Sequence, residues 1–365
     1  MADFRVYYDA ANALLHGDVL YGKAFGVSSG FYKYSPFACI PFIPLAILPY
    51  SVASALYYLL TTGAIIFFSL RITRYLSGSK RNDTEIALPV ITGIFLIDHL
   101  ERELHLGNVN LLLLIALFET FILLKSNRNG KAGMLYGVIL LFKPHFLLLL
   151  PYFVWKRRFT AIATTGLSLM AGLLLPSLAL GWLPNLQLLL QWSTAMSDHN
   201  IALQLSPNTI YGLINRFWFA GDAGSWLVIA VLTTIAISFV GWMIIHDKRE
   251  GKVLSGEVRY IEYFFLIGIV PNLVHTDTEH FMWVWPVLAV AVQAVLQTEN
   301  AKRRVILTLL AFAFIPFAVN SPDIVGKRVQ HIFDEGGLGL ANILVLCCGI
   351  IAHYTLPSHV GKLNP

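Results

Sequence analysis

The sequence predicts an all-α protein, a polytopic bundle of transmembrane helices. Of its 365 residues, 56% are hydrophobic and only 13% are charged, whereas a soluble domain carries about 25% charged residues. The mean hydropathy is +0.66. Apolar runs between residues 36 and 355 have the length of about 20 residues that a membrane span requires. We therefore expect the lipid bilayer to surround most of the chain.

The apolar runs predict about ten spans within a transmembrane domain of residues 36–355. The runs are residues 36–70, 86–97, 108–124, 132–155, 160–181, 224–246, 260–274, 281–298, 305–320 and 338–355. Pro49 and the pair Lys143-Pro144 interrupt two of these runs, so each is one broken span or a pair of half-spans. This domain includes a long outer loop at about 182–223. An outer interfacial segment (1–35) precedes it, and a cytoplasmic tail (356–365) follows it.

The basic residues indicate the orientation. One orientation places every basic cluster on the same side of the bilayer, provided that 132–155 is a pair of half-spans. The clusters are Arg71/Arg74/Lys80/Arg81, Lys125/Arg128/Lys131, Lys156/Arg157/Arg158, Lys248/Arg249/Lys252/Arg259 and Lys302/Arg303/Arg304. By the positive-inside rule that side is the cytoplasm, and we expect a multi-pass protein of the plasma (inner) membrane. The net charge of +5 then comes from loops, and no nucleic-acid partner is expected.

The outer segment opens with an acidic and aromatic motif, Asp3-Phe-Arg-Val-Tyr-Tyr-Asp9. Tyrosines at this spacing are typical of a helix that lies in the membrane interface. One interpretation is a simple interfacial anchor. The other is that a carboxylate held at the membrane surface acts as a general base.

Two further motifs place polar groups on the same outer side. The charged turn of residues 98–107 leads into Gly107-Asn108-Val109-Asn110, where a glycine and two amides allow close approach of a ligand; the alternative is a solvated loop with Arg102 paired to a neighbouring acid. Lys143 and His145 interrupt an apolar stretch. A lysine there can bind phosphate, or it can extend its ammonium to the interface from a helix break.

A third group lies on a short hairpin between two apolar runs: His275, Asp277, Glu279 and His280. These side chains can hydrogen-bond a sugar or phosphate, bind a metal, or form a plain polar hairpin. Because their order matches no metal-ligand signature, no metal site is assigned and a divalent-metal requirement stays open. Arg216 in the long outer loop is a weaker candidate for a ligand contact, because its signal favours an ordinary solvated loop.

The sequence contains no phosphate-binding loop, dinucleotide fingerprint or nucleophile elbow. A nucleotide-driven enzyme is therefore not expected. A phosphate ligand would arrive within the membrane, attached to a lipid.

The motifs, in their order along the chain, resemble glycosyltransferase family 87, membrane enzymes of the GT-C class that take a hexose, typically mannose, from a polyprenyl phosphate donor. The resemblance is carried by the segment Asp3 to Gly17, Tyr34-Ser-Pro-Phe-Ala, the segment Pro44 to Pro49, Gly107-Asn-Val-Asn-Leu-Leu, Lys143-Pro-His and the hairpin that ends in His280. The family places a spanning helix before the acidic motif, so the resemblance implies either a start upstream of Met1 or a relative that has lost this helix.

The resemblance implies a GT-C-like fold and inverting transfer on the extracytoplasmic face, to a lipid or glycan acceptor, with Asp3 as the catalytic base. It implies no cofactor beyond the polyprenyl-phosphate-linked sugar, which is the donor substrate. From polarity and side of the membrane, the candidates for donor phosphate or sugar contacts are Lys143, His145, Arg216, His275, Asp277, His280, Asn108, Asn110 and Asp9.

Two other functions remain open from the sequence. A transporter or lipid flippase also places polar groups inside a helical bundle, although transporters often repeat their helix breaks in both halves and the breaks at Pro49 and Lys143-Pro144 do not recur. A non-catalytic relative would tolerate loss of Asp3, Lys143 and His280.

Overall fold

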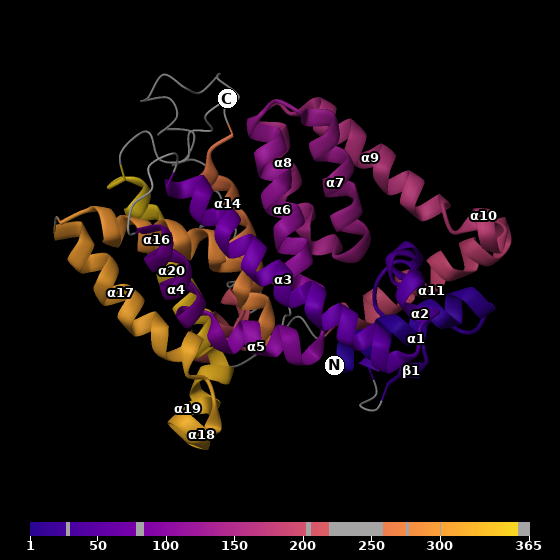
Figure 1. Ribbon diagram of the computed structural model, residues 1–365, viewed down its shortest axis with the longest axis horizontal. Coiled ribbons are helices and arrows are strands. Elements are labelled where there is room, and N and C mark those ends of the chain that lie inside the picture. The colour runs from indigo at the N-terminus through magenta and orange to yellow at the C-terminus, as the bar shows by residue number, and fades with distance from the viewer. Residues whose placement is uncertain are drawn as a thin grey trace. The chain divides into compact units, whose positions relative to one another are not determined.

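The computed structural model describes residues 1–26, 30–77, 84–201, 206–218, 258–274, 277–299 and 301–356, without the side chains of 84, 198–201 and 215–218. These residues are almost entirely helical (Figure 1), which confirms the predicted all-α class. The chain divides into two compact units. The first comprises Met1–Arg71, Leu100–Phe153 and Phe159–Ile201, and the second comprises Ile72–His99, Val154–Arg158 and Ala202–Pro365.

The first unit begins with the amphipathic helix α1 (Ala2–His16), which buries Phe4, Tyr7, Ala11 and Leu14 at helical spacing. Its other elements are β1 (Ala24–Phe25), β2 (Gly30–Phe31), the 3₁₀ helix η1 (Pro36–Phe42), α2 (Ile43–Ala46), α3 (Tyr50–Ser77), α5 (Ile97–Leu106), α6 (Asn110–Lys125), α7 (Asn129–Phe142), the 3₁₀ helix η2 (Pro144–Leu149), α8 (Leu150–Trp155), α9 (Phe159–Leu174), α10 (Ser177–Leu180) and α11 (Trp182–Ile201). The last residues of α3 and α8 and the first of α5 belong to the second unit.

Helices α7 and α9 pack closely because α7 presents small residues to its neighbour. A Cβ atom on Gly133 would lie 2.0 Å from the carbonyl oxygen of Ala161, and one on Gly137 would lie 2.6 Å from the Cβ of Ser168. Small residues four apart let two membrane helices approach to backbone contact. This packing fixes α7, whose last residue directly precedes Lys143.

The second unit is built around α16 (Trp285–Gln297), whose side chains are buried from Trp285 through Ala294. Glycines again mark the close contacts, since a Cβ on Gly349 would lie 2.2 Å from Val287. The surrounding elements are α4 (Thr84–Phe95), α12 (Ile210–Trp218), α14 (Tyr260–Gly268), α15 (Val270–Leu273), the 3₁₀ helix η4 (Thr278–Val284), α17 (Ala301–Ala318), α18 (Pro322–Val325), α19 (Lys327–Ile332), the π-helical turn η5 (Phe333–Gly337) and α20 (Leu338–His353).

The expected count of about ten spans is not confirmed. Among the described residues, four helical stretches are long and apolar enough to cross a membrane, or five if a bent pair is one span: Tyr50–Ser77, Phe159–Leu180, Thr278–Gln297, Lys327–His353 and the pair α5–α6. The expected span at 224–246 lies outside the described residues. Elsewhere, turns and prolines divide the apolar runs: α6 has 16 residues and is about 24 Å long, against a hydrocarbon core of about 30 Å.

Two polar segments expected as loops are helical instead. The outer loop predicted at about 182–223 contains α11 and α12, and the charged turn at 98–107 is largely α5. In α5 the buried residues His99, Leu100 and Glu103 recur at spacings of three and four, which is the helical period. The charges concealed this period because they occur on both faces: Glu101 and Arg102 are exposed, whereas Glu103 is buried.

The breaks at Pro49 and Lys143-Pro144 occur as predicted. Helix α3 begins at Tyr50, directly after Pro49. Helix α7 ends at Phe142, and Lys143 adopts an extended conformation with φ −132° and ψ 90°, because the ring of a following proline disfavours the helical region. The break therefore turns the Lys143 side chain out of the path of the helix.

Gly107 joins the amphipathic helix α5 to α6, two helices that meet at an angle of 115°. Its φ is +70°, and a Cβ at this position would lie 2.8 Å from the Cβ of Phe4 and 2.9 Å from the Cε of Met1. Only glycine satisfies both the left-handed conformation and this close approach. The bend of the chain at Gly107 and the position of α1 are thus linked.

We expect Gly107→Ala to lower the stability of the protein. The left-handed conformation alone costs a residue with a Cβ about 1–2 kcal/mol, and the contact with Phe4 involves a Cβ that no rotamer change can move. The thermal unfolding midpoint of the purified variant measures the effect. Gly93→Ala is the control, because a Cβ on Gly93 meets nothing within 4 Å; equal midpoints for the two variants would contradict the argument.

Candidate functional site

The bend between α5 and α6 forms the centre of a hydrogen-bonded site in the first unit. Gly107 and Asn108 both direct their backbone N–H groups to the carbonyl oxygen of Glu103, at 2.9 and 3.3 Å. This closes α5 and turns the next residues toward the interior of the unit. Asn108 and Asn110 are 5% and 0% exposed, so their amides need partners within the protein.

Asn108 holds the carboxylate of Asp3. The Nδ2 of Asn108 donates to Oδ2 of Asp3 at 2.6 Å. The orientation of this amide follows from a second contact: the backbone N–H of Val109 donates to Oδ1 of Asn108 at 2.7 Å, and a backbone N–H can only donate. Nδ2 must therefore face Asp3. The carboxylate, which is half-buried, is thus held by a neutral amide donor.

Three tyrosines complete the surroundings of Asn108. The hydroxyl of Tyr7 donates to Oδ1 of Asn108 at 3.0 Å and lies 3.2 Å from the hydroxyl of Tyr34. The hydroxyl of Tyr57 donates to the backbone carbonyl of Asn108 at 2.9 Å. Burial, followed by the neighbouring Tyr34 and Asp3, raises the pKa of Tyr7 well above its ordinary value. Tyr7 therefore stays protonated and keeps donating at any physiological pH.

Lys143 belongs to the same bend through Asn110. Its Nζ donates to Oδ1 of Asn110 at 2.5 Å, and Nδ2 of Asn110 donates to Oε2 of Glu103 at 3.0 Å. The other oxygen of Glu103 accepts the backbone N–H of Leu111 at 2.8 Å, within the first turn of α6. A carboxylate is favourable at a helix N-terminus. Lys143 as a whole is 6% exposed.

The structure thus brings four predicted site residues into one cluster: Asp3, Asn108, Asn110 and Lys143. Asp3 and Lys143 are held by amides only two residues apart on the α5–α6 bend. A carboxylate that can accept a proton and an ammonium that can stabilise a departing phosphate form a suitable pair for group transfer at a phosphorylated carbon.

Sequence reasoning missed Glu103 and the three tyrosines. Glu103 is fully buried, although in the sequence it is one charge of a dense polar segment. The helical spacing from Leu100 and His99 was the signal that places it on the buried face. Tyr7 and Tyr34 belong to segments expected to be interfacial, and Tyr57 lies in an apolar run, so only their hydrogen-bond partners place these tyrosines in the site.

Asp9 and His145 lie near this cluster in sequence and have other contacts. Asp9 accepts from Nε of Arg5 at 2.8 Å, and its side chain is 24% exposed. The imidazole of His145 packs on the ring of Phe146 with centroids 4.9 Å apart. The roles in donor binding predicted for both residues stay predictions.

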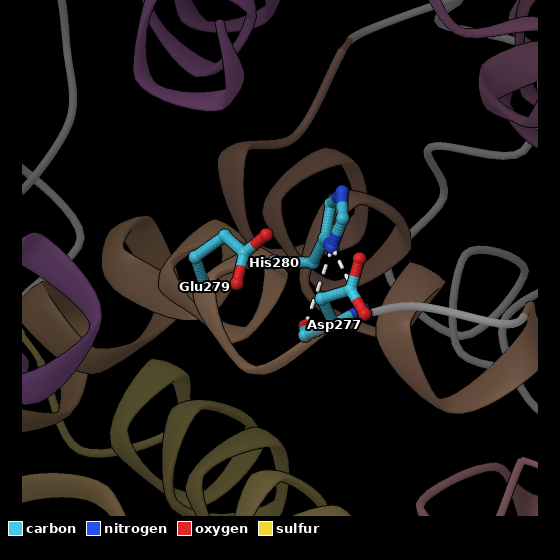
Figure 2. A group of neighbouring side chains, drawn as sticks. All are labelled: Asp277, Glu279 and His280. Carbon is cyan, nitrogen blue, oxygen red and sulfur yellow. Dashed lines mark hydrogen bonds between the residues drawn. The ribbon is translucent and has the colours of Figure 1, made fainter. Parts of the chain in front are cut away.

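In the second unit, Asp277, Glu279 and His280 gather at the start of η4 (Figure 2). The backbone N–H of Asp277 donates to Nδ1 of His280 at 3.0 Å, so the neutral imidazole carries its proton on Nε2. One ligand atom from each of the three side chains lies within 4.8 Å of the others. They can share a divalent cation, or His280 can donate to a phosphate or sugar oxygen.

Buried His99 supports this hairpin: its Nδ1 lies 2.8 Å from the carbonyl oxygen of Thr278. Two other predicted ligand contacts fall where the structure describes no side chain. His275 lies outside the described residues, and so does the side chain of Arg216, although its backbone belongs to α12.

We expect Tyr7→Phe to reduce activity moderately, by about five-fold. The variant loses one hydrogen bond to Asn108, which contributes about 1 kcal/mol, while the Val109 N–H still orients the amide. The measurement is kcat for the transfer reaction proposed below. Tyr58→Phe is the matched control, because the Tyr58 side chain is exposed. A decrease in kcat as large as that expected for Asp3→Asn would contradict a merely supporting role of Tyr7.

Comparison with known proteins agrees with the resemblance seen in the sequence. The family model described as Glycosyltransferase family 87 matches residues 31–259, a range that contains Glu103, Asn108, Asn110 and Lys143. No solved structure matches the chain.

A curated relative is the polyprenol-phosphate-mannose-dependent alpha-(1-2)-phosphatidylinositol pentamannoside mannosyltransferase of Mycobacterium tuberculosis (strain CDC 1551 / Oshkosh). It is 25% identical over 295 residues, which cover 78% of this chain and 65% of that protein. Since the family model spans more than half of the chain, the family is established. The chain belongs to glycosyltransferase family 87.

Proposed function

We propose that this protein transfers a hexose, mannose in the first instance, from a polyprenyl phosphate donor to a lipid or glycan acceptor. The single observation that carries the proposal is the cluster in which Asn108 holds Asp3 and Asn110 holds Lys143. Family membership and the donor named for the mycobacterial relative supply the class of reaction and of donor.

The proposed reaction is an inverting displacement at C1 of the sugar. The acceptor hydroxyl oxygen forms a bond to C1 while the bond from C1 to the phosphate oxygen breaks. The electron pair of that bond leaves with polyprenyl phosphate, and Asp3 takes the hydroxyl proton. Because C1 gains positive charge as the bond breaks, catalysis depends on a base for the acceptor and a cation for the leaving group.

Each group of the cluster has a role in this proposal. Asp3 is the general base, Lys143 contacts the donor phosphate, and Asn108 orients Asp3. His280, through the proton on Nε2, together with His275, Asp277, Arg216, His145 and Asp9, is proposed for contacts to the donor sugar or phosphate. The reaction is placed on the extracytoplasmic face, which is supported by the basic clusters on the opposite side of the predicted spans.

A transfer assay with purified protein in lipid nanodiscs tests the proposal. Polyprenyl-phosphate-mannose and polyprenyl-phosphate-glucose, each labelled in the sugar, are offered with phosphatidylinositol mannosides and with other membrane glycolipids. We expect labelled glycolipid in at least one combination. Parallel reactions with EDTA determine whether a divalent metal is required.

The same assay separates the alternatives. A transporter or flippase would move labelled lipid across the bilayer of proteoliposomes without forming a new glycosidic bond. A non-catalytic relative would give neither result. No transfer from any donor, combined with unchanged cellular glycolipids in an Asp3→Asn strain, would refute the enzymatic proposal.

A further inference from the structure

Glu103 is a buried acid that is linked through Asn110 to Lys143, the residue proposed to contact the donor phosphate. It is 0% exposed and lies on the inner face of α5. One oxygen accepts the backbone N–H of Leu111 at 2.8 Å and the other accepts Nδ2 of Asn110 at 3.0 Å. A buried carboxylate is costly unless its hydrogen bonds compensate for lost hydration, so its presence at this point requires an explanation.

The donors and acceptors fix the direction of every bond from Glu103 to Lys143. An ionised carboxylate only accepts, and an ammonium only donates. The amide of Asn110, placed between them, must turn Nδ2 to Glu103 and Oδ1 to Lys143. This orientation agrees with the observed contacts of 3.0 and 2.5 Å. Glu103 thereby determines which atom of Asn110 the lysine meets.

We propose that Glu103 and Asn110 are positioning residues that hold the Lys143 ammonium at the phosphate of the donor. The inference rests on the proposed function, and it adds a residue that acts without touching substrate. The extended backbone of Lys143 before Pro144 sets the direction of the side chain, and the Glu103–Asn110 pair fixes its end.

A simpler role must be distinguished from this one, because Glu103 also accepts a backbone N–H in the first turn of α6. As a helix cap alone, it would contribute to stability and leave the lysine unaffected. The two roles predict different activities when donors and acceptors are exchanged along the chain Glu103–Asn110–Lys143 and when a second substitution restores a consistent pattern.

Glu103→Gln exchanges donor and acceptor at each step of this hydrogen-bond chain. The Leu111 N–H still requires an acceptor, so the new glutamine must give it Oε1 and turn Nε2 toward Asn110. Oδ1 of Asn110 must then accept from this Nε2, which leaves Nδ2 of Asn110 opposite the Lys143 ammonium. Two donors then face each other, and the lysine loses the acceptor oxygen of Asn110. The cap itself is retained.

Asn110→Asp fails for the opposite reason, because two carboxylates then meet where Glu103 and Asn110 now share a hydrogen bond. The double variant Glu103→Gln with Asn110→Asp restores a consistent arrangement. The glutamine donates to the new aspartate, which accepts from Lys143 with its other oxygen. The net charge of the pair is also that of the wild type.

The experiment measures kcat, donor KM and inhibition by the product polyprenyl phosphate for the wild type, both single variants and the double variant. Loss of a hydrogen bond to a charged group predicts that each single variant raises the donor KM or the inhibition constant about 10- to 100-fold. The double variant should return to within about three-fold of the wild type, which is a strong non-additivity. Glu101→Gln, on the exposed face of α5, is the control and should match the wild type.

The outcomes separate the possibilities. If the double variant combines the two losses, or if Glu103→Gln behaves as Glu101→Gln in an otherwise active enzyme, the positioning role is refuted and the proposed function stands. If the wild type transfers no sugar, the proposed function fails, and affinity for polyprenyl phosphate alone tests the positioning role. Thermal unfolding of all variants identifies any loss that arises from misfolding.

Discussion

Replacing Asp3 with asparagine is expected to lower kcat for sugar transfer about 100- to 10,000-fold, the usual contribution of a general base. The substitution is close to isosteric, and the new amide oxygen can still accept the hydrogen bond that Asn108 donates at 2.6 Å. The geometry of α1 is therefore preserved while the proton acceptor is lost. This makes the variant a test of chemistry and not of folding.

Asp18→Asn is the matched control for this variant. Asp18 follows the end of α1 and is exposed, so its carboxylate should contribute little to the reaction. Donor KM should change less than kcat in Asp3→Asn, because the base acts in the transition state. An Asp3→Asn enzyme with wild-type kcat would remove Asp3 from the mechanism.

Replacing Lys143 with methionine is expected to have the second-largest effect, a decrease in kcat of about 100- to 1,000-fold, as for the loss of one group that stabilises developing negative charge. The methionine retains most of the length of the buried side chain but leaves Oδ1 of Asn110 without the donor it meets at 2.5 Å. Inhibition by polyprenyl phosphate should weaken in parallel, since product and leaving group present the same phosphate.

Lys33→Met is the control, since Lys33 lies in the outer segment with an exposed side chain. Lys143→Arg should also have low activity compared with the wild type, because the guanidinium is larger and planar and the site is buried. If Lys143→Met and Lys33→Met have equal kcat and equal inhibition by polyprenyl phosphate, Lys143 does not contact the phosphate.

The two proposed groups differ in how well the sequence predicted them. Asp3 was found through the resemblance of its motif, and Lys143 through a polar residue in an apolar stretch at a proline. Asn108 and Asn110 were candidates because their amides follow a glycine and because their motif belongs to the resemblance. The structure assigns their partners, and with them the roles we propose: one amide holds Asp3 and the other holds Lys143.

Secondary structure around the site was predicted less accurately. The turn at 98–107 is a helix, and this difference explains why Glu103 was missed. Charged residues at both faces of a short segment obscure its period, so that the buried position cannot be separated from the exposed ones by composition. Helix α11 was expected within a loop. It mixes apolar and polar residues and exposes several leucines, so its hydropathy does not distinguish it from a loop.

The sequence by itself determined the helical membrane class, the helix breaks at Pro49 and Pro144 and the family. These depend on composition and on local backbone chemistry, which act over a few residues. Only the tertiary structure decided which polar residues form one site. Asp3 and Asn108 are 105 positions apart, and Lys143 and Asn110 are 33 apart. Contacts at such separations depend on how the helices pack and on which donor meets which acceptor, and neither is encoded in a local pattern.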